Sequence, residues 1–347
     1  MRYNNLGHSE MKVSELCLGS MTWGSQNTRR DAFEQIDMAL DYGVNFIDTA
    51  EMYPTTPLSK DTQGNTEGII GDWINQSGRR SDIIIATKVS GKGYENVRDG
   101  APISPASITT AIESSLRSLC TDYIDLYQLH WPNRGSYMFR QNWTYDPTRQ
   151  DTNATLDHMV EVLRHLDNLC LSGKIRHIGL SNETAWGTMR WLTTAAAHDL
   201  PRVVSIQNEY NLLCRLYDLD MAELSHHEKI GLLSFSPLAA GLLSGKYADG
   251  TIPNGSRRSI NPDLGGRINT HLWPALNGYL GIAKRHELDP CQMALAWAAT
   301  RPFITSQIIG ATTKAQLQTA LGSTTVTLSK AVIRDIQNIY RRYPMPY

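Results

Sequence analysis

The chain has 347 residues, of which 41% are hydrophobic and 19% are charged, and its formal net charge is −1. This composition is typical of a globular protein, and the even charge balance predicts neither a nucleic-acid partner nor an anionic membrane surface. No apolar run approaches the roughly 18 residues of a membrane span, and residues 1–16 lack the apolar core of a signal peptide. The five scattered cysteines form no C-x-x-C pair, which is typical of reduced thiols, so we expect a cytoplasmic protein.

Short apolar runs alternate with amphipathic segments along the whole chain. Runs that are almost entirely apolar are typical of strands buried on both faces of a parallel sheet. The expected strands are 15–19, 44–47, 82–87, 123–129, 175–180, 203–206, 231–235 and 306–309. Residues with the spacing of one helical face predict helices at 29–42, 66–77, 105–119, 155–172, 184–198, 217–228, 291–300 and 313–321.

Eight strand–helix pairs predict an α/β fold, a (β/α)8 TIM barrel that occupies residues 1–347 as a single domain. An open doubly wound sheet is the alternative, but no glycine-rich dinucleotide motif follows a strand. A further helical pattern at 329–342 predicts an additional C-terminal helix. Two long irregular segments, 131–154 and 247–272, follow strands, and we expect them to be functional loops at the C-terminal rim.

Four polar side chains follow strands at the end of a barrel where catalytic groups lie. Asp48, Lys88 and His130 end three consecutive strands, and Tyr53 stands on the loop after Asp48. Lys88 would neutralise Asp48 and lower the pKa of Tyr53 from about 10. Tyr53 could then protonate a developing alkoxide, and His130 could donate a hydrogen bond to the same oxygen. This set predicts reduction of a carbonyl by a nicotinamide cofactor.

Each of these residues also has a structural interpretation. Asp48 alone could be a turn cap, Lys88 a solvated strand end, and His130 a buried structural histidine. Their occurrence together at one rim favours catalysis. No metal site is expected, because the chain has no H-E-x-x-H motif and its adjacent histidines at 226 and 227 are poorly placed to chelate one ion.

Longer stretches of the sequence carry a resemblance to a known family. They include LCLGSMTWG, NFIDTAEMYP, IIIATKVSG, DYIDLYQLHWP, GKIRHIGLSNET, IQNEYNLL, FSPLAAGLLSGKY and IIGATTKAQL. Along essentially its whole length the chain resembles the aldo-keto reductases, in the bacterial Tas-type branch related to voltage-gated potassium-channel β subunits. The resemblance implies an NADPH-dependent oxidoreductase that reduces aldehydes or ketones with the tetrad Asp48, Tyr53, Lys88 and His130.

The resemblance also implies an extended binding site for NADPH or NADP+. On the nicotinamide side it comprises Ser20, Met21, Thr22, Gln26, Asp48, Ser181, Asn182, Gln207 and Phe235, with Phe235 stacking on the ring. The pyrophosphate and the remaining phosphate charges would be met by Ser236, Pro237, Leu238, Ala239, Lys246 and Arg257, and the adenosine end by Gly310, Thr312 and Gln316.

The sequence departs from the family pattern in two places. Thr319 and Ala320 stand where related sequences have an acidic residue and an asparagine near the adenine, which leaves the strength of the preference for NADPH over NADH open. In the second long segment, Arg257, Arg258 and Arg267 are alternative partners for the 2′-phosphate.

Substrate and partners are less determined by the sequence. Trp23, Met52, Tyr53, His130 and Trp131 could wall a pocket for a planar or apolar carbonyl, although the tryptophans could instead pack beneath the 131–154 segment. The oligomeric state is open. The alternative function is an NADPH-binding redox-sensing or regulatory subunit with little turnover, and the histidine expected at the reacting oxygen favours the enzyme. A barrel enzyme for phosphorylated sugars is disfavoured, because no paired carboxylates end the strands.

Overall fold

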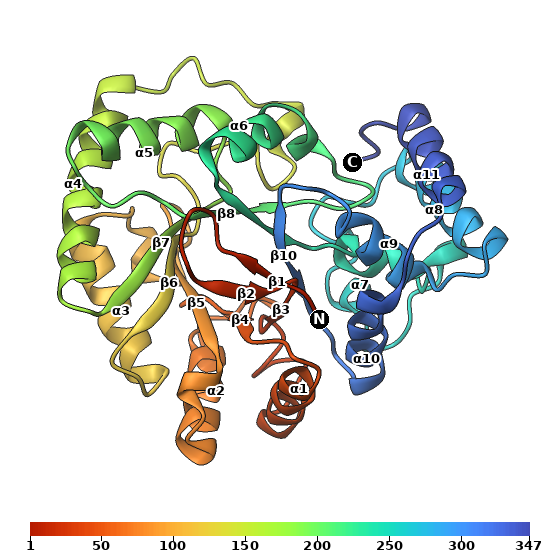
Figure 1. Ribbon diagram of the computed structural model, residues 1–347, viewed down its shortest axis with the longest axis horizontal. Coiled ribbons are helices and arrows are strands. Elements are labelled where there is room, and N and C mark those ends of the chain that lie inside the picture. Colours follow the sequence, from red (N-terminus) through yellow and green to blue (C-terminus); the bar gives the residue numbers. More distant parts are fainter.

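The computed structural model describes residues 1–347 and contains a closed barrel of eight parallel strands surrounded by helices (Figure 1). The strands are β3 (Leu16–Gly19), β4 (Phe46–Asp48), β5 (Ile84–Val89), β6 (Ile124–Leu129), β7 (Ile175–Ser181), β8 (Ser205–Glu209), β9 (Gly231–Phe235) and β10 (Ile304–Ile309). They follow one another around the barrel in chain order, and β10 closes it by pairing with β3. The predicted barrel is therefore confirmed, and all eight expected strands are present.

Helices follow the strands and cover the outside of the barrel (Figure 1). They are α1 (Arg29–Asp41), α2 (Asn65–Ser77), α3 (Pro105–Ser118), α4 (Thr152–Leu171), α5 (Ala185–Ala197), α6 (Asp220–Glu228), α9 (Pro290–Ala298), α10 (Lys314–Gly322) and the predicted additional helix α11 (Lys330–Arg342). Local sequence determines where several of them begin. Thr28 and Ser104 each form a capping box, and Pro105 occupies the first turn of α3. No helix is both long and apolar enough to cross a membrane.

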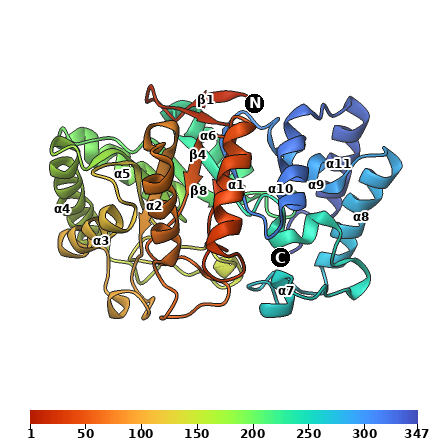
Figure 2. The same ribbon diagram turned by 90° about the horizontal axis from the view of Figure 1, so that it is seen from below.

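An N-terminal hairpin that was not predicted closes the bottom of the barrel. Strands β1 (Tyr3–Asn5) and β2 (Lys12–Ser14) pair antiparallel, and residues Leu6 and Val13 join the barrel-interior cluster. At Gly7 (φ +59°) an added Cβ would lie 2.0 Å from the carbonyl oxygen of Val204, so only glycine allows this approach. Figure 2 shows β1 at one end of the barrel and α7 (Arg257–Ile260) with the C-terminus at the other.

A second element missed by the sequence patterns is α8 (Leu272–Arg285), which follows the second long segment. It has no side-chain N-cap and contains a proline and two glycines, so its local signals are weak. The helix is stabilised by packing instead: it lies against α11 (Figure 1). An added Cβ on Gly278 would lie 2.8 Å from Cδ1 of Ile339, which shows how closely the two helices approach.

Candidate active site

The centre of the site is a buried ion pair between Lys88 at the end of β5 and Asp48 at the end of β4. The Lys88 Nζ lies 2.7 Å from Asp48 Oδ2, 2.7 Å from the carbonyl oxygen of Thr49 and 3.4 Å from the phenolic oxygen of Tyr53. Burial lowers the pKa of Lys88, but Asp48 followed by Tyr53 raises it, and the net pKa lies above the usual value. Lys88 therefore stays a cation that points at the Tyr53 hydroxyl.

The pKa of Tyr53 differs in direction from the expectation. Burial of the phenol is the largest influence and raises its pKa above the usual value, while Lys88 acts in the opposite direction. Asp48 also raises it, because its negative charge repels the phenolate form of Tyr53. The predicted net lowering of this pKa is therefore wrong, and at neutral pH the side chain is a protonated hydrogen-bond donor.

His130 lies next to Tyr53 and completes the group of four. The two ring centroids are 6.0 Å apart, with the rings nearly perpendicular. Burial, and then Lys88, lower the pKa of His130 well below its usual value, so the imidazole is neutral. Its backbone is fixed by a hydrogen bond from the Asn182 Nδ2 to its carbonyl oxygen (2.9 Å) and by its own N–H to the carbonyl oxygen of Val89 (2.9 Å). A neutral imidazole can donate one N–H to a carbonyl oxygen.

The second oxygen of Asp48 is held by two glutamines. The Gln207 Nε2 donates to Asp48 Oδ1 at 2.8 Å and the Gln128 Nε2 at 3.3 Å. Gln207 was expected among the nicotinamide contacts, and its Oε1 makes no hydrogen bond within the chain. Gln128 was missed, although a glutamine within the apolar run of β6 is a signal that could have identified it.

The expected carboxamide contacts lie at the end of β7. The Ser181 hydroxyl donates to the carbonyl oxygen of Gln207 (2.9 Å), and the Asn182 Nδ2 also reaches the Ser181 hydroxyl (3.1 Å). Asn182 has a left-handed backbone (φ +53°), which turns its side chain back over the strand end. Its Oδ1 is buried without a hydrogen-bond partner. A buried acceptor without a donor is costly, and it fits the N–H groups of a carboxamide.

The expected phosphate contacts follow β9. Ser236, Ala239 and Ala240 have positive φ values near +50° (φ 50°, 49° and 57°), and such a cluster of left-handed non-glycine residues is characteristic of functional loops. Arg257 makes no ion pair, and its Nε is buried without a partner. Burial, and then Arg267, lower the pKa of Arg257 to about 10. An additional anion would relieve both effects.

The other two arginines of that segment already have partners. Arg267 donates from its Nε and Nη2 to Glu209 Oε1 at 3.0 and 2.8 Å. Arg258 reaches the carbonyl oxygen of Thr251 and lies over the Trp273 ring. Arg258 also makes no ion pair and has a buried Nε without a partner, but of the three alternatives for the 2′-phosphate Arg257 alone makes no side-chain hydrogen bond to an oxygen atom. No signal in the sequence distinguished them.

The segment 20–26 lies against this region. The Arg257 Nη1 approaches the Met21 sulfur at 4.0 Å, and the Gln26 Nε2 donates to the carbonyl oxygen of Gly255 at 3.3 Å. The Ser20 hydroxyl donates to the carbonyl oxygen of Asp48 (2.7 Å). The residues expected on the nicotinamide side and those expected at the phosphates therefore line one continuous region of the rim.

The expected adenosine end is held by its own hydrogen bonds. The Thr312 N–H and hydroxyl both donate to Gln316 Oε1, at 3.0 and 3.1 Å, at the start of α10. The Thr319 hydroxyl donates to the carbonyl oxygen of Ala315 in its own helix, and Ala320 is buried. Thr319 and Ala320, the two departures from the family pattern, therefore offer no free polar side-chain group at the expected adenosine end.

Two of the three expected pocket residues outside the tetrad lie near the reaction centre. Trp131 packs against the small cluster that contains Met52, and the Trp131 and His130 ring centroids lie 4.9 Å apart. Trp23 is fully buried in the main core and donates from Nε1 to Gln35 Oε1 at 2.9 Å. The prediction that Trp23 lines the substrate pocket is therefore wrong. Its side chain is enclosed by the core, where the indole N–H already has a hydrogen-bond partner. Phe139, which was missed, packs edge-on against Trp131 and is 43% exposed.

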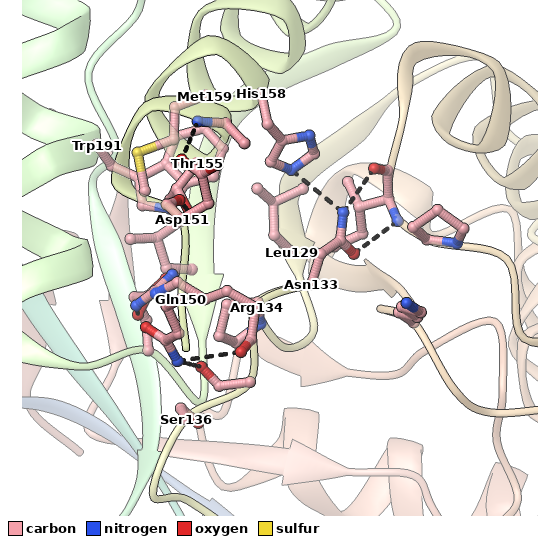
Figure 3. Close-up of a pocket in the computed structure, with 18 of the residues that line it drawn as sticks. Leu129, Asn133, Arg134, Ser136, Gln150, Asp151, Thr155, His158, Met159 and Trp191 are labelled. Atoms are coloured by element: carbon pink, nitrogen blue, oxygen red, sulfur yellow. Dashed lines mark hydrogen bonds and ion pairs between the residues drawn. The ribbon is translucent and has the colours of Figure 1, made fainter. Parts of the chain in front are cut away.

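A cavity lies beside the tetrad. It has a volume of about 710 Å³ and lies beneath the 131–154 segment, between the strand ends and α4 (Figure 3). Its lining includes Leu129, Asn133 and His158 but none of the four tetrad residues. The Asn133 amide is engaged with the backbone of Ile103, and its Nδ2 lies 3.3 Å from the His158 Nε2 (Figure 3). The cavity therefore borders the reaction centre without containing it.

Glu209 at the end of β8 joins the two long segments and the C-terminus. Its carboxylate accepts hydrogen bonds from Arg140 Nη1 (2.8 Å), from Arg267, and from the hydroxyl of the terminal residue Tyr347 (3.2 Å). Burial raises the pKa of Glu209, but Arg267 and Arg140 outweigh it, and the net pKa is lowered. This connection was not predicted, because its partners are far apart in the sequence.

We expect the substitution Glu209→Gln to loosen both long segments at once. Arg267 would be left buried and Arg140 partly buried without a counter-charge, and breaking a buried pair costs about 3–5 kcal/mol. Hydrogen exchange should therefore rise in 131–154 and 247–272, and the melting temperature should fall. Glu113→Gln is the matched control, because the Glu113–Lys174 pair is exposed and its loss should leave both measurements unchanged. Unaltered exchange in the two segments of Glu209→Gln would contradict the role of Glu209.

Known proteins resemble this chain over its full length. The aldo/keto reductase family model matches residues 15–341. Protein tas of Escherichia coli (strain K12) is 42% identical over 352 residues, which cover 100% of this chain and 99% of that protein. The uncharacterized oxidoreductase YrpG of Bacillus subtilis (strain 168) is 31% identical, covering 98% of this chain and 96% of that protein. A probable voltage-gated potassium channel subunit beta of Arabidopsis thaliana is also 31% identical, covering 99% and 98%. The chain therefore belongs to the aldo/keto reductase family of oxidoreductases.

Proposed function

We propose that the protein reduces the carbonyl group of an aldehyde or ketone to an alcohol with NADPH, and that Tyr53 is the general acid. The observation that carries this proposal is the contact of the buried Lys88 ammonium with both Asp48 and the Tyr53 hydroxyl. A phenol kept protonated by burial and faced by a cation can release its proton when negative charge develops on a nearby oxygen.

Each member of the tetrad has a separate task at the carbonyl oxygen. Tyr53 donates its phenolic proton, and Lys88 stabilises the phenolate that remains. Asp48 balances the charge of Lys88, which would otherwise be costly to bury. Neutral His130 donates a hydrogen bond to the same oxygen, an arrangement of the oxyanion-hole kind. The nicotinamide supplies the hydride when it is bound.

The chain offers the groups that this cofactor needs. The unpartnered Asn182 Oδ1 and the free Gln207 Oε1 suit the carboxamide N–H groups, and Phe235 at the end of β9 offers a ring for stacking. Arg257 and Lys246 make no ion pair within the chain and suit phosphate oxygens. We place the nicotinamide against the tetrad and the phosphates along the loop after β9.

Arg257→Ala is expected to weaken NADPH binding more than NADH binding. Loss of one charge-assisted contact to the 2′-phosphate should cost about 1.5–3 kcal/mol, or roughly 10–100-fold in Kd. Titration of protein fluorescence with each nucleotide measures both values. Arg258→Ala, which removes an arginine already in contact with Thr251 and Trp273, should change neither by more than about twofold. An equal loss of affinity for the two nucleotides would instead place Arg257 at the pyrophosphate.

The proposed activity is tested by following NADPH oxidation with a panel of aliphatic and aromatic aldehydes and ketones. Turnover with at least one carbonyl substrate is expected. NADPH binding without turnover on the whole panel would favour the second candidate function, a regulatory NADPH-binding subunit. The Arabidopsis relative, a probable voltage-gated potassium channel subunit beta, makes a subunit role the alternative to consider. His130, placed beside Tyr53, favours the enzyme, because a binding module does not need a donor at the reacting oxygen.

A further inference from the structure

A glutamine on β6 contacts the tetrad from inside the barrel. Gln128 is fully buried and lies in register between Lys88 of β5 and Gly179 of β7. A Cβ added to Gly179 would lie 3.1 Å from the Gln128 Cγ and 2.6 Å from the hydroxyl of Ser205. Gly179 therefore provides the space that the Gln128 side chain occupies.

The ionised carboxylate of Asp48 determines how the two glutamine side chains are turned. A carboxylate only accepts hydrogen bonds, so the amide atoms that face Asp48 Oδ1 must be the nitrogens of Gln128 and Gln207. The Gln207 Nε2 also lies 3.2 Å from the Gln128 Oε1 and donates its second hydrogen to that oxygen. The two amides and the carboxylate therefore form a closed triangle of hydrogen bonds.

The two glutamines differ in what else they touch. Gln207 keeps an Oε1 with no partner in the chain, which we assign to the cofactor. Gln128 has both amide atoms engaged, the nitrogen with Asp48 and the oxygen with Gln207, and it contacts neither Tyr53 nor His130 by a hydrogen bond. Any effect of Gln128 on the reaction must therefore pass through Asp48 or through Gln207, and the Kd for NADPH distinguishes the two routes.

We propose that Gln128 is a positioning residue that sets the acidity of Tyr53 through Asp48 and Lys88, an inference that rests on the proposed function. Donors at Oδ1 draw negative charge away from Oδ2, the oxygen that faces Lys88. The lysine charge is then less neutralised by Asp48 and acts more strongly on the Tyr53 hydroxyl.

Loss of the Gln128 amide should therefore make Tyr53 a weaker acid. Asp48 would keep more of its negative charge at the ion pair, and the phenolate of Tyr53 would be less stabilised. A general acid acts in its protonated form, so the alkaline limb of the pH–rate profile for carbonyl reduction should move to higher pH. The rate of the chemical step at neutral pH should fall.

Gln128→Met tests this, because methionine has a similar length and no amide. We expect the single-turnover rate of reduction to fall about tenfold, the lower end of the loss that follows when the hydrogen-bond partner of a metal-ligating side chain is removed. The alkaline limb should move upward, while the Kd for NADPH, measured by fluorescence, should stay within about twofold. Gln207→Met should lower both the rate and the NADPH affinity.

Tyr127→Phe is the matched control on the same strand. The Tyr127 hydroxyl is buried and has no hydrogen-bond partner, so its removal alters the interior of β6 without touching Asp48. The rate, the pH profile and the Kd should all stay at their wild-type values. A purely structural effect of Gln128→Met would lower the melting temperature and leave the pH profile in place.

The inference and the proposed function fail in different ways. If Gln128→Met retains the wild-type rate and alkaline limb while Tyr53→Phe is inactive, the role of Gln128 is wrong and the proposed function stands. If Tyr53→Phe is as active as wild type, the proposed function itself is wrong. Should Gln128→Met not fold, Gln128→Glu gives the answer, because a protonated glutamate can still donate to Asp48 and an ionised one cannot. At low pH, where the glutamate is protonated, the rate of this variant should match that of wild type. As the glutamate ionises the rate should fall, at a lower pH than the wild-type rate does. A wild-type pH–rate profile would overturn the proposal.

Discussion

Tyr53→Phe is expected to lower carbonyl reduction by about 10²–10⁴-fold, the usual contribution of one positioned proton donor. The ring still packs against the small apolar cluster that contains Met52, and only the hydroxyl that faces Lys88 is lost, so the melting temperature should change little. The Kd for NADPH should also stay near its wild-type value, because the groups assigned to the cofactor carboxamide and phosphates lie outside the loop that carries Tyr53. Turnover, fluorescence titration and thermal unfolding measure the three quantities.

The control for this variant is Tyr127→Phe, which removes another buried tyrosine hydroxyl, one without a hydrogen-bond partner. That variant should keep wild-type turnover. If Tyr53→Phe retains turnover near the wild-type rate on a good carbonyl substrate, Tyr53 is not the general acid. Asp48 and Lys88 would then be a structural ion pair at the barrel rim.

Lys88→Met is expected to abolish turnover and to destabilise the fold as well. It removes the cation that faces Tyr53 and leaves the Asp48 carboxylate buried without a counter-charge, and breaking such a pair costs about 3–5 kcal/mol. The pKa of Tyr53 should rise further, because Lys88 is the main influence that opposes burial. Denaturant unfolding and turnover, measured on the same preparation, test both effects.

The double variant Asp48→Asn with Lys88→Met separates stability from catalysis. It removes both charges, so much of the lost stability should return, while turnover should stay absent. A Lys88→Met protein as stable as wild type would contradict the cost assigned to the unpaired Asp48 carboxylate. Recovery of turnover in the double variant would contradict the role of Lys88 at Tyr53.

The barrel and the positions of the tetrad could be predicted from the sequence because their signals are local. A short run such as IDLYQL, with every residue buried, indicates a strand covered on both faces. Once strands alternate with helices, Asp48, Lys88 and His130 must end neighbouring strands at one rim. The strand order inferred from the sequence was therefore sufficient to predict that these side chains lie close to one another.

Two elements of the fold had no clear local signal. The hairpin β1–β2 has three-residue strands, and α8 lacks a side-chain N-cap and contains proline and glycine. Both are stabilised by tertiary contacts, the hairpin through Leu6 and Val13 at the bottom of the barrel and α8 through α11. Local patterns fail where packing supplies the stability.

The functional details that only the tertiary structure decided depend on contacts between distant residues. Asp48 meets Gln207 across 159 positions of the chain, and Glu209 meets Tyr347 across 138. Burial decided the direction of the Tyr53 pKa and placed Trp23 in the core. Only the structure shows that Arg267 binds Glu209 and Arg258 contacts Thr251, whereas Arg257 has no oxygen partner. The sequence by itself determined the fold and which side chains stand at the strand ends. Desolvation and hydrogen-bond partners depend on what surrounds each group in space, so the protonation states and the free polar groups required the folded structure.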